Sequence, residues 1–291
     1  MPRAKPSRSP AVGASLAPRF GVAGTVAVLV LAGRRAGVDS LADATHVSHK
    51  CLLELAGEPM ILRVIRALRA DSRFGCITVS IDERAVLERH PKLGELFRAG
   101  EVGIHQSRPS PSASVLDFYK ALPRGTQLLV TTADHALLTT EMVAWFWSRA
   151  ERSGADVVAG LVSGERFRAR FPDQPRTLIR FSDATYSGAN LFAFRGVKAA
   201  AAAAFWVKAE KYRKKPWRLI GMFGLRNLFS LLMGRLDRRT AFERASRKLK
   251  ARLHAVELPF AEAAIDVDKP ADLELAARIL AERAGTPSTH G

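Results

Sequence analysis

Short apolar runs alternate with amphipathic stretches along most of the chain. The runs are rich in valine, isoleucine and leucine and are too short for buried helices, so they predict strands. Between them, apolar residues recur every three or four positions, which is the spacing of a helix with one buried face. Repeated strand–helix alternation with short connections predicts an α/β fold, a mostly parallel, Rossmann-like sheet flanked by helices. The predicted strands are 25–31, 76–81, 102–105, 127–132, 156–162 and 253–258.

Residues typical of helix starts precede several of the amphipathic stretches. Pro59 precedes the first of them, and its fixed φ suits the start of a helix. We expect Asp82 to cap a short helix. We also expect Thr139 or Thr140 to cap a longer helix in the middle of the chain.

The pattern changes after residue 162. Two strand candidates, 177–181 and 189–194, are joined by a polar stretch, which predicts a small antiparallel hairpin or an addition at the sheet edge. The loop before them is crowded with arginines. This cluster fits either a solvated loop or a clamp for an anionic group. Its members are Arg166, Arg168, Arg170 and Arg176.

The chain has 291 residues, which is enough for one large α/β domain with a full core. Residues 1–21 are rich in proline, serine, alanine and arginine and contain no acid, so we expect a disordered basic tail there. The rest of the chain, 22–286, is expected to form one domain that includes a basic helical insertion at about 198–252.

The formal net charge is +17, which predicts attraction to polyanions such as nucleotides, nucleic acid or an anionic membrane. The segment 205–252 alone holds fifteen lysine and arginine residues against three acids, interleaved with tryptophan and phenylalanine. It fits helices packed on the body with a solvated basic face, and it also fits peripheral contact with an anionic membrane. Nucleic acid is the least favoured partner, since no recognised nucleic-acid module is present.

The sequence favours a cytoplasmic protein. Cys51 and Cys76 cannot form a disulfide framework and lack metal-binding spacing, so we expect them to pack in the core of a protein in a reducing compartment. The apolar run 26–32 is short for a secretory signal, and Arg34 and Arg35 follow it in place of a small-residue cleavage site. No run reaches the ~18 apolar residues of a membrane span, so any membrane contact is expected at the inner face.

Candidate chemistry begins where the first predicted strand ends. That strand ends at Leu31, Ala32 and Gly33, and Arg34 and Arg35 follow directly. A glycine-containing basic turn at the carboxyl edge of a sheet presents backbone N–H groups and cations, which suits phosphate binding. Taken by itself, one such turn is more typical of an ordinary strand–helix loop.

Carboxylates follow two other predicted extended segments. Asp134 comes directly after the strand 127–132. Asp266 and Asp268 alternate in an extended segment before the last helix, so their side chains should point to the same side. Carboxylate oxygens are the ligands that Mg²⁺ prefers. For Asp266 taken alone, an ion pair with a lysine is the simpler role.

The order of these features resembles that of the nucleotidyltransferases with a molybdenum-cofactor-guanylyltransferase-like NTP-transferase domain. Their fold is shared with the A-type glycosyltransferases. The resemblance covers roughly residues 26–284. The first loop departs from the usual Leu-Ala-Gly-Gly pattern, because Arg34 stands at the second glycine. The matching positions are Leu31–Gly33, Lys50 before Gly57-Glu58-Pro59, Thr132–Asp134, and Asp268 to Leu273.

For the nucleotide, the resemblance implies that the turn Leu31–Gly33 and its arginines, Arg34 and Arg35, hold the triphosphate. Lys50 corresponds to a signature lysine that neutralises the phosphates in the transition state. Ser114 resembles the serine that begins a helix beside the nucleotide in the cytidylyltransferases for isoprenoid precursors.

For the metal and the acceptor, the resemblance implies a second group of residues. Asp134 corresponds to an aspartate that binds Mg²⁺, and Asp268 or, less closely matched, Asp266 corresponds to the second acidic ligand. A loop near the acceptor is implied at Ser187, Gly188 and Asn190.

The implied function is that of a Mg²⁺-dependent nucleotidyltransferase. It would transfer a nucleoside monophosphate from an NTP to a phosphorylated small molecule or lipid headgroup and release pyrophosphate. This chemistry brings anions together, so the protein supplies charge neutralisation and alignment more than acid–base groups.

Two alternatives stay open. The first is a glycosyltransferase of the same fold that uses a nucleotide sugar. A metal-binding Asp-x-Asp pair would favour it, but Asp134 stands alone at its strand end. The second is a non-catalytic protein of the membrane surface, acting through 205–252. The identity of the nucleotide, the acceptor and the oligomeric state stay open as well.

Overall fold

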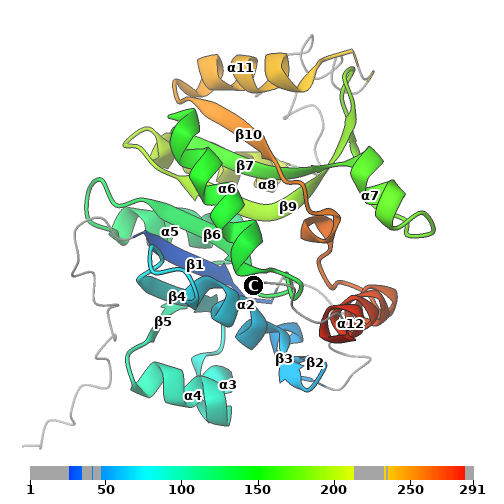
Figure 1. Cartoon of the computed structure of the whole chain (residues 1–291). Coiled ribbons are helices and arrows are strands. Elements are labelled where there is room, and N and C mark those ends of the chain that lie inside the picture. Colours follow the sequence, from blue (N-terminus) through cyan, green and yellow to red (C-terminus); the bar gives the residue numbers. More distant parts are fainter. Residues whose placement is uncertain (1–25, 35–40, 42–46, 213–232, 234, 286–291) are drawn as a thin grey trace, which may run out of the picture.

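The computed structural model describes residues 26–34, 41, 47–212, 233 and 235–285 (Figure 1). The predicted tail 1–21 and Arg35 therefore lie outside the described residues, as does most of the middle of the basic segment 205–252. The strands are β1 (Ala27–Leu31), β2 (Glu54–Leu55), β3 (Glu58–Pro59), β4 (Cys76–Ile81), β5 (Val102–Gln106), β6 (Leu128–Thr132), β7 (Val157–Ser163), β8 (Ile179–Arg180), β9 (Thr185–Phe194) and β10 (Leu253–Glu257). The helices are η1 (Lys50–Leu52), α2 (Met60–Arg69), α3 (Arg84–Arg89), α4 (Pro91–Arg98), α5 (Pro111–Ala121), α6 (Thr140–Ser153), α7 (Gly164–Arg170), α8 (Ala199–Tyr212), α11 (Arg238–Leu249), η2 (Ala261–Ala264) and α12 (Pro270–Gly285).

A mostly parallel sheet forms the centre of the molecule. Its strands follow the order β10-β7-β9-β6-β1-β4-β5, and β8 pairs with β9 at one side. The pairs of β1 with β4 and β6, of β4 with β5, and of β7 with β10 are parallel. The strand β9 runs antiparallel to both of its neighbours, β6 and β7. The predicted α/β class is confirmed.

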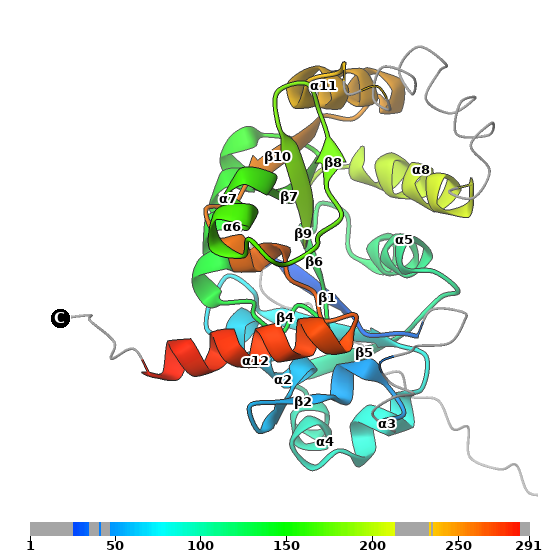
Figure 2. The ribbon, with the colours of Figure 1, turned by 90° about the vertical axis from the view of Figure 1, so that its right-hand side faces the viewer.

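Helices cover both faces of this sheet, because alternate residues of each strand point to opposite sides. Val28 and Val30 of β1 join one buried cluster with apolar residues of α2 and α6. Ala27 and Leu29 join a second cluster with residues of α5 and α8. Figure 2 shows α5 and α8 on one side of the sheet and α6 on the other.

The helix α6 illustrates how local signals and packing agree. Thr139 is its N-cap, and the Thr139 side chain accepts a hydrogen bond from the Met142 N–H. Phe146 and Trp147 are fully buried under the sheet. Of the two predicted caps, Thr139 is therefore the one that the structure uses.

One local prediction is wrong. Asp82 does not cap the next helix: the N-cap of α3 is Glu83, without a side-chain hydrogen bond, and Asp82 instead binds Arg34. The helix predicted after Pro59 is confirmed, since α2 begins at Met60 and has Pro59 as its N-cap. The segment between Lys50 and this helix has structure that the sequence did not predict. It forms η1 and then the hairpin β2–β3, which pairs Leu55 with Glu58 around Ala56 and Gly57.

The second strand of the predicted hairpin has an unexpected position. β8 and β9 do pair as an antiparallel hairpin. However, β9 begins at Thr185, earlier than predicted, and lies between β6 and β7 inside the sheet and not at its edge. Most of its ten residues are buried, which fits a strand in the middle of a sheet that is covered on both faces.

The described parts of the basic segment are helical, as predicted. α8 packs beside α5, and the Glu210 side chain accepts hydrogen bonds from the backbone and hydroxyl of Ser112. α11 lies near β10 and has no buried residue (Figure 1). Among the helices of the described ranges, none is long and apolar enough to cross a membrane.

Candidate active site

The ends of β1 and β6 bring two of the predicted loops together. These strands are parallel neighbours, and Leu31 is paired with Thr132. The Ala133 N–H donates a hydrogen bond of 2.9 Å to the Leu31 carbonyl oxygen. Because parallel strands end at the same edge of a sheet, the loop after Leu31 and the carboxylate of Asp134 lie next to each other.

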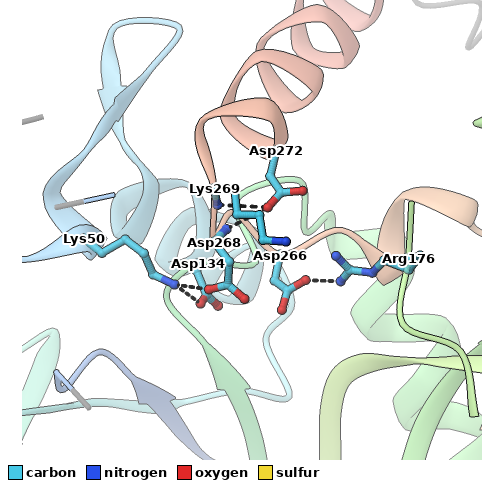
Figure 3. A network of polar contacts seen from close by, with 7 residues as sticks. All are labelled: Lys50, Asp134, Arg176, Asp266, Asp268, Lys269 and Asp272. Atoms are coloured by element: carbon cyan, nitrogen blue, oxygen red, sulfur yellow. Dashed lines mark hydrogen bonds and ion pairs between the residues drawn. The ribbon is translucent and has the colours of Figure 1, made fainter. Parts of the chain in front are cut away.

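The side chain of Lys50 joins this edge from a distant part of the sequence. Lys50 is the first residue of η1, which the β2–β3 hairpin follows. The Met60 N–H donates a hydrogen bond to the Leu53 carbonyl oxygen, which joins the two ends of this hairpin segment. The Lys50 ammonium lies 2.7 Å from Asp134 Oδ2 and 2.5 Å from Asp268 Oδ1 (Figure 3). One lysine therefore bridges the two carboxylates that the sequence selects.

The backbone and the start of α12 hold Asp268 in place. The Val267 N–H donates to the carbonyl oxygen of Asp134, which links the two carboxylate-bearing segments directly. The Asp272 side chain accepts hydrogen bonds from the backbone N–H groups of Asp268 and Lys269. A carboxylate at this position satisfies free donors at the helix start, so Asp272 fixes the loop that carries Asp268.

The surroundings keep the Lys50 ammonium charged. Burial opposes the charged form, but the ion pairs with Asp134 and Asp268 outweigh it and raise the pKa of Lys50. The neighbouring Cys51 is buried, and burial raises the pKa of its thiol to about 12. Cys51 is therefore a neutral packing residue at pH 7, as predicted, and Lys50 is the charged group here.

Asp266 has a different partner from Asp268. Its carboxylate forms an ion pair with the guanidinium of Arg176, which comes from the loop between α7 and β8 (Figure 3). Both side chains are largely buried. Burial lowers the pKa of Arg176, while Asp272, Asp268 and Asp134 act against that change. Of the four arginines crowded in this part of the sequence, Arg176 is the one that forms an ion pair with an aspartate of the segment before α12.

The pair Asp134 and Asp268 fits a Mg²⁺ ion. Asp134 Oδ1 is buried and has no hydrogen-bond partner in the described part of the chain, so one oxygen is free to bind a cation. Within the described ranges, no group of three or more His, Cys, Asp or Glu side chains is placed to hold a metal ion. Mg²⁺ commonly takes only one or two carboxylates and completes its coordination with water and substrate phosphates. Two carboxylates therefore suffice. That Asp266 is a further ligand stays a prediction, and the ion pair with Arg176 argues against it because it occupies the Asp266 carboxylate.

The first loop holds an ion pair that the sequence did not reveal. Asp82, just after β4, accepts hydrogen bonds from the backbone N–H of Arg34 at 3.1 Å and from its Nε at 2.8 Å. The buried ring of His49 places Nε2 3.3 Å from the same carboxylate. Burial opposes ionisation of Asp82, but the hydrogen bonds from Arg34 outweigh it and lower the pKa of the carboxyl. Arg34, which departs from the family pattern, thus reaches toward β4.

Gly33 and Ser114 lie near the same edge of the sheet. A Cβ atom at Gly33 would come within 2.9 Å of the Ser107 hydroxyl, so glycine allows the loops after β1 and β5 to approach closely. The Ser114 hydroxyl is buried at the start of α5, where it accepts a hydrogen bond from the Arg108 N–H and donates one to the Ser110 carbonyl. The role of Ser114 beside a nucleotide stays a prediction.

The predicted acceptor residues lie along β9. Ser187 and Gly188 pair with Val162 and Leu161 of β7, near the end of that strand. The register then shifts at a bulge, and Asn190 takes a left-handed conformation with φ of 48°. β9 pairs with β6 only from Phe192 onward, so the bulge lies where β9 approaches the end of β6. Bulges of this kind often redirect side chains beside active sites.

Sequence reasoning missed Asp82 and His49 as residues of this edge and did not decide between two roles for Arg176. The ion pair of Arg34 with Asp82 spans 48 positions, and that of Arg176 with Asp266 spans 90. Such distant pairs leave no local pattern. The one available signal for Asp82 was its position directly after a buried parallel strand, which is the same signal that selected Asp134.

Comparison with known proteins identifies the family. The sequence matches the MobA-like NTP transferase domain over residues 28–250, which is most of the chain. The chain belongs to the MobA-like NTP transferase family. The match begins in β1 and includes Lys50 and Asp134, while Asp268 lies beyond its end. Membership of this family supports nucleotidyl transfer as the general class of reaction. A search of curated proteins finds no match.

Solved structures agree with this family. A hypothetical transferase from Thermus thermophilus is 27% identical, with a TM-score of 0.70 over 86% of this chain and 99% of that one. A 4-diphosphocytidyl-2C-methyl-D-erythritol synthase from Anaerococcus prevotii is 13% identical, with a TM-score of 0.51 over 89% of this chain and 99% of that one. A CMP:2-keto-3-deoxy-manno-octonic acid synthetase in complex with CTP is 14% identical, with a TM-score of 0.52 over 89% of this chain and 100% of that one. At these identities the last two show the shared fold alone.

Proposed function

We propose that this MobA-like NTP transferase transfers a nucleoside monophosphate from an NTP to a phosphorylated acceptor and releases pyrophosphate. The observation that supports this most strongly is the Lys50 ammonium held between Asp134 and Asp268 at the carboxyl edge of the sheet. The same edge carries the glycine-containing loop after β1. A cation and two carboxylates beside such a loop are the groups that a metal-assisted phosphate transfer requires.

Each charged residue has a separate task in this proposal. Asp134 and Asp268 would hold Mg²⁺, which when bound neutralises phosphate charge and polarises the α-phosphate. Lys50 would then exchange its carboxylate partners for phosphate oxygens of the nucleotide. The turn Leu31–Gly33, together with Arg34 and Arg35, would hold the triphosphate and receive the leaving pyrophosphate.

The acceptor side is proposed to lie along β9. Arg176 supplies a guanidinium whose planar fork suits a phosphate group, and Ser187, Gly188 and Asn190 would line the same side. An acceptor that is already an ionised phosphate needs no general base. In this proposal the acceptor is a phosphorylated small molecule or lipid headgroup, and the location is the cytoplasm.

Pyrophosphate release from a panel of NTPs and phosphate monoesters tests the proposal. Lys50→Ala and Asp134→Ala should each lower the rate by about a hundredfold or more, as is typical when a group that stabilises transition-state charge is removed. Lys120→Ala removes an exposed lysine of α5 and serves as the matched control with an unchanged rate. Thermal melting should show that all three variants fold. Normal turnover in Lys50→Ala would refute the assignment.

A further inference from the structure

A cavity lies between α2, α12 and the start of α6. Its volume is about 390 Å³, which is within the range of small-molecule sites. It is separate from the carboxylates of the candidate active site. None of Lys50, Asp134 and Asp268 lines it, although Ala136, which does, lies two residues after Asp134.

Three arginines line this cavity with one carboxylate to balance them. Arg63 and Arg66 project from α2 and Arg283 projects from α12. Glu58 pairs with Arg66 at 2.7 Å and lies 3.9 Å from Arg63. Arg283 has no carboxylate within ion-pair distance among the described residues. The cavity therefore carries an excess of positive charge that an anion would balance.

Two of the guanidinium groups are already fixed in position. Arg63 donates to the carbonyl oxygens of Leu55 and Ala56, and Arg283 donates to that of Leu137. Burial lowers the pKa of both groups. Glu58 opposes this at Arg63, where Arg66 adds to it, and Arg63 adds to it at Arg283. Glu262 opposes it at Arg283 but lies closer to Arg170. Arginines held in place by neutral carbonyls keep further N–H donors for a ligand, since each guanidinium has five.

The rest of the cavity wall is apolar. Ala67 of α2, Leu138 before α6 and Leu280 of α12 line it. The two threonine hydroxyls nearby are used within the protein: Thr139 caps α6, and Thr140 donates to the Ala67 carbonyl. A ligand that fits would combine one anionic group with a short apolar body.

We propose that this cavity is a binding site for a small organic anion, a carboxylate or phosphate on a short aliphatic body. The anionic group lies among Arg63, Arg66 and Arg283, and the aliphatic part lies on the apolar wall. The site is separate from the nucleotide site, and it does not depend on the function proposed above.

The placement of the arginines connects this cavity to the carboxylate edge. Leu137 lies three residues after Asp134, and Leu55 lies in the hairpin that follows Lys50. Arg283 shares a helix with the segment that presents Asp268. A bound anion would therefore stabilise the three segments that bring Lys50, Asp134 and Asp268 together.

Isothermal titration of the full chain with butyrate, hexanoate and inorganic phosphate tests the proposal. Hexanoate should bind about tenfold more tightly than butyrate, because two more methylene groups leave water. Arg66→Gln and Arg283→Gln should each weaken hexanoate binding about tenfold or more. Arg66 is 64% exposed, so its replacement leaves the core intact. Arg239→Gln, at an arginine of α11 that is 89% exposed, is the matched control.

Two further measurements separate this site from the nucleotide site and test its coupling. Lys50→Ala leaves the cavity lining unchanged, so this variant should still bind hexanoate, and any weakening through the coupled segments should be smaller than that in Arg283→Gln. Hydrogen exchange at 54–59 and 134–139 should slow when hexanoate is bound, since ligands stabilise the segments that they contact.

Several results would overturn the proposal. Equal affinities for butyrate and hexanoate, or equal binding in the two arginine variants and the control, would show that this cavity is not the site. Loss of binding in Lys50→Ala would place the anion at the carboxylate edge instead. Unchanged hydrogen exchange would refute the coupling. Tighter binding of inorganic phosphate than of hexanoate would refute the apolar half of the site.

Discussion

At the scale of single residues, Lys50 and its two carboxylate partners form the centre of the account. The ammonium lies between Asp134 and Asp268 where a metal ion and a triphosphate are proposed to bind. A buried charge is tolerated because two opposite charges surround it. A substrate that separates Lys50 from Asp134 and Asp268 must give each of them a new partner of opposite charge. A nucleotide with a bound divalent cation does this, because its phosphates pair with the lysine and its cation pairs with the carboxylates.

Asp82 gives a prediction for the pH dependence of stability. Its pKa is lower in the folded chain than in the unfolded chain, so its contribution is present above the unfolded pKa of about 4 and is lost as pH falls through the folded value. Asp82→Asn should therefore reduce the free energy of unfolding at pH 7, by less than about 1 kcal/mol because Arg34 is half exposed.

Urea unfolding at pH 7 and near pH 2 checks this expectation. The difference between wild type and Asp82→Asn should shrink toward zero at the acidic end. Asp173→Asn changes an exposed aspartate in the loop after α7 and is the control. A difference that stays constant with pH would show that the Arg34 ion pair contributes nothing.

Arg176 gives a prediction about substrate binding. If it holds the acceptor phosphate, Arg176→Gln should raise KM for the phosphorylated acceptor about tenfold or more and leave KM for the NTP near the wild-type value. Arg168→Gln, at an exposed arginine of α7, should change neither constant. Equal increases in both KM values would indicate that Arg176 acts only by positioning Asp266.

At the scale of elements, the β2–β3 hairpin is what turns the chain between Lys50 and α2. Its two turn residues, Ala56 and Gly57, have φ of 49° and 73°. Two-residue hairpin turns with both φ values positive strongly prefer Asn-Gly, because a Cβ atom is unfavourable there. Ala56 is thus a locally strained residue in the segment that carries Lys50.

Substitutions in this turn should change stability in opposite directions. Ala56→Asn should raise the free energy of unfolding by about 0.5 kcal/mol, and Gly57→Ala should lower it by about 1 kcal/mol. Chemical denaturation measures both. Ala70→Asn, at an exposed alanine with ordinary right-handed backbone at the end of α2, serves as the control and should not stabilise. A loss of stability in Ala56→Asn would contradict the turn assignment.

Local signals in the sequence explain which elements could be predicted. Buried strands such as β1 and β6 were found because an apolar run of five or six residues has few other structures open to it. The β2–β3 hairpin was missed because two-residue strands carry no periodicity. β9 was placed at an edge because strand order depends on contacts between distant residues, which spacing along the chain does not encode.

The same reasoning applies to the candidate site. Lys50, Asp134 and Asp268 were selected from their order along the chain, and the structure brings all three together. The partners of Arg34 and Asp266 could not be read from the sequence, since Asp82 and Arg176 are far from them along the chain. A carboxylate after a strand looks the same whether it binds a metal ion or an arginine.

At the scale of the whole molecule, the positive charge is unevenly distributed. The helix α11 buries none of its residues, and Arg239, Arg247 and Lys248 on it are exposed, as is Lys250, which caps its end. Contact of the segment 205–252 with an anionic membrane stays a prediction, and α11 is the described element that would contribute to it.

Vesicle sedimentation checks the membrane prediction. The chain should sediment with phosphatidylglycerol vesicles at low ionic strength and remain in the supernatant with phosphatidylcholine vesicles. Salt at about 0.5 M should release it, because the Debye length then falls to roughly 4 Å and the attraction between exposed charges is screened. Replacement of Arg247, Lys248 and Lys250 by glutamine should reduce the bound fraction. An unchanged bound fraction in this triple variant would exclude α11 as a contact.

The carboxylate edge is proposed to bind an NTP together with Mg²⁺. The most direct test is calorimetric titration of the wild type with ATP, CTP, GTP and UTP, each with and without Mg²⁺, and with a set of nucleotide sugars. We expect Mg²⁺-dependent binding of at least one NTP, and loss of that binding in Asp134→Ala. Binding of a nucleotide sugar in place of every NTP, or NTP binding that is unaffected by Asp134→Ala, would contradict this proposal.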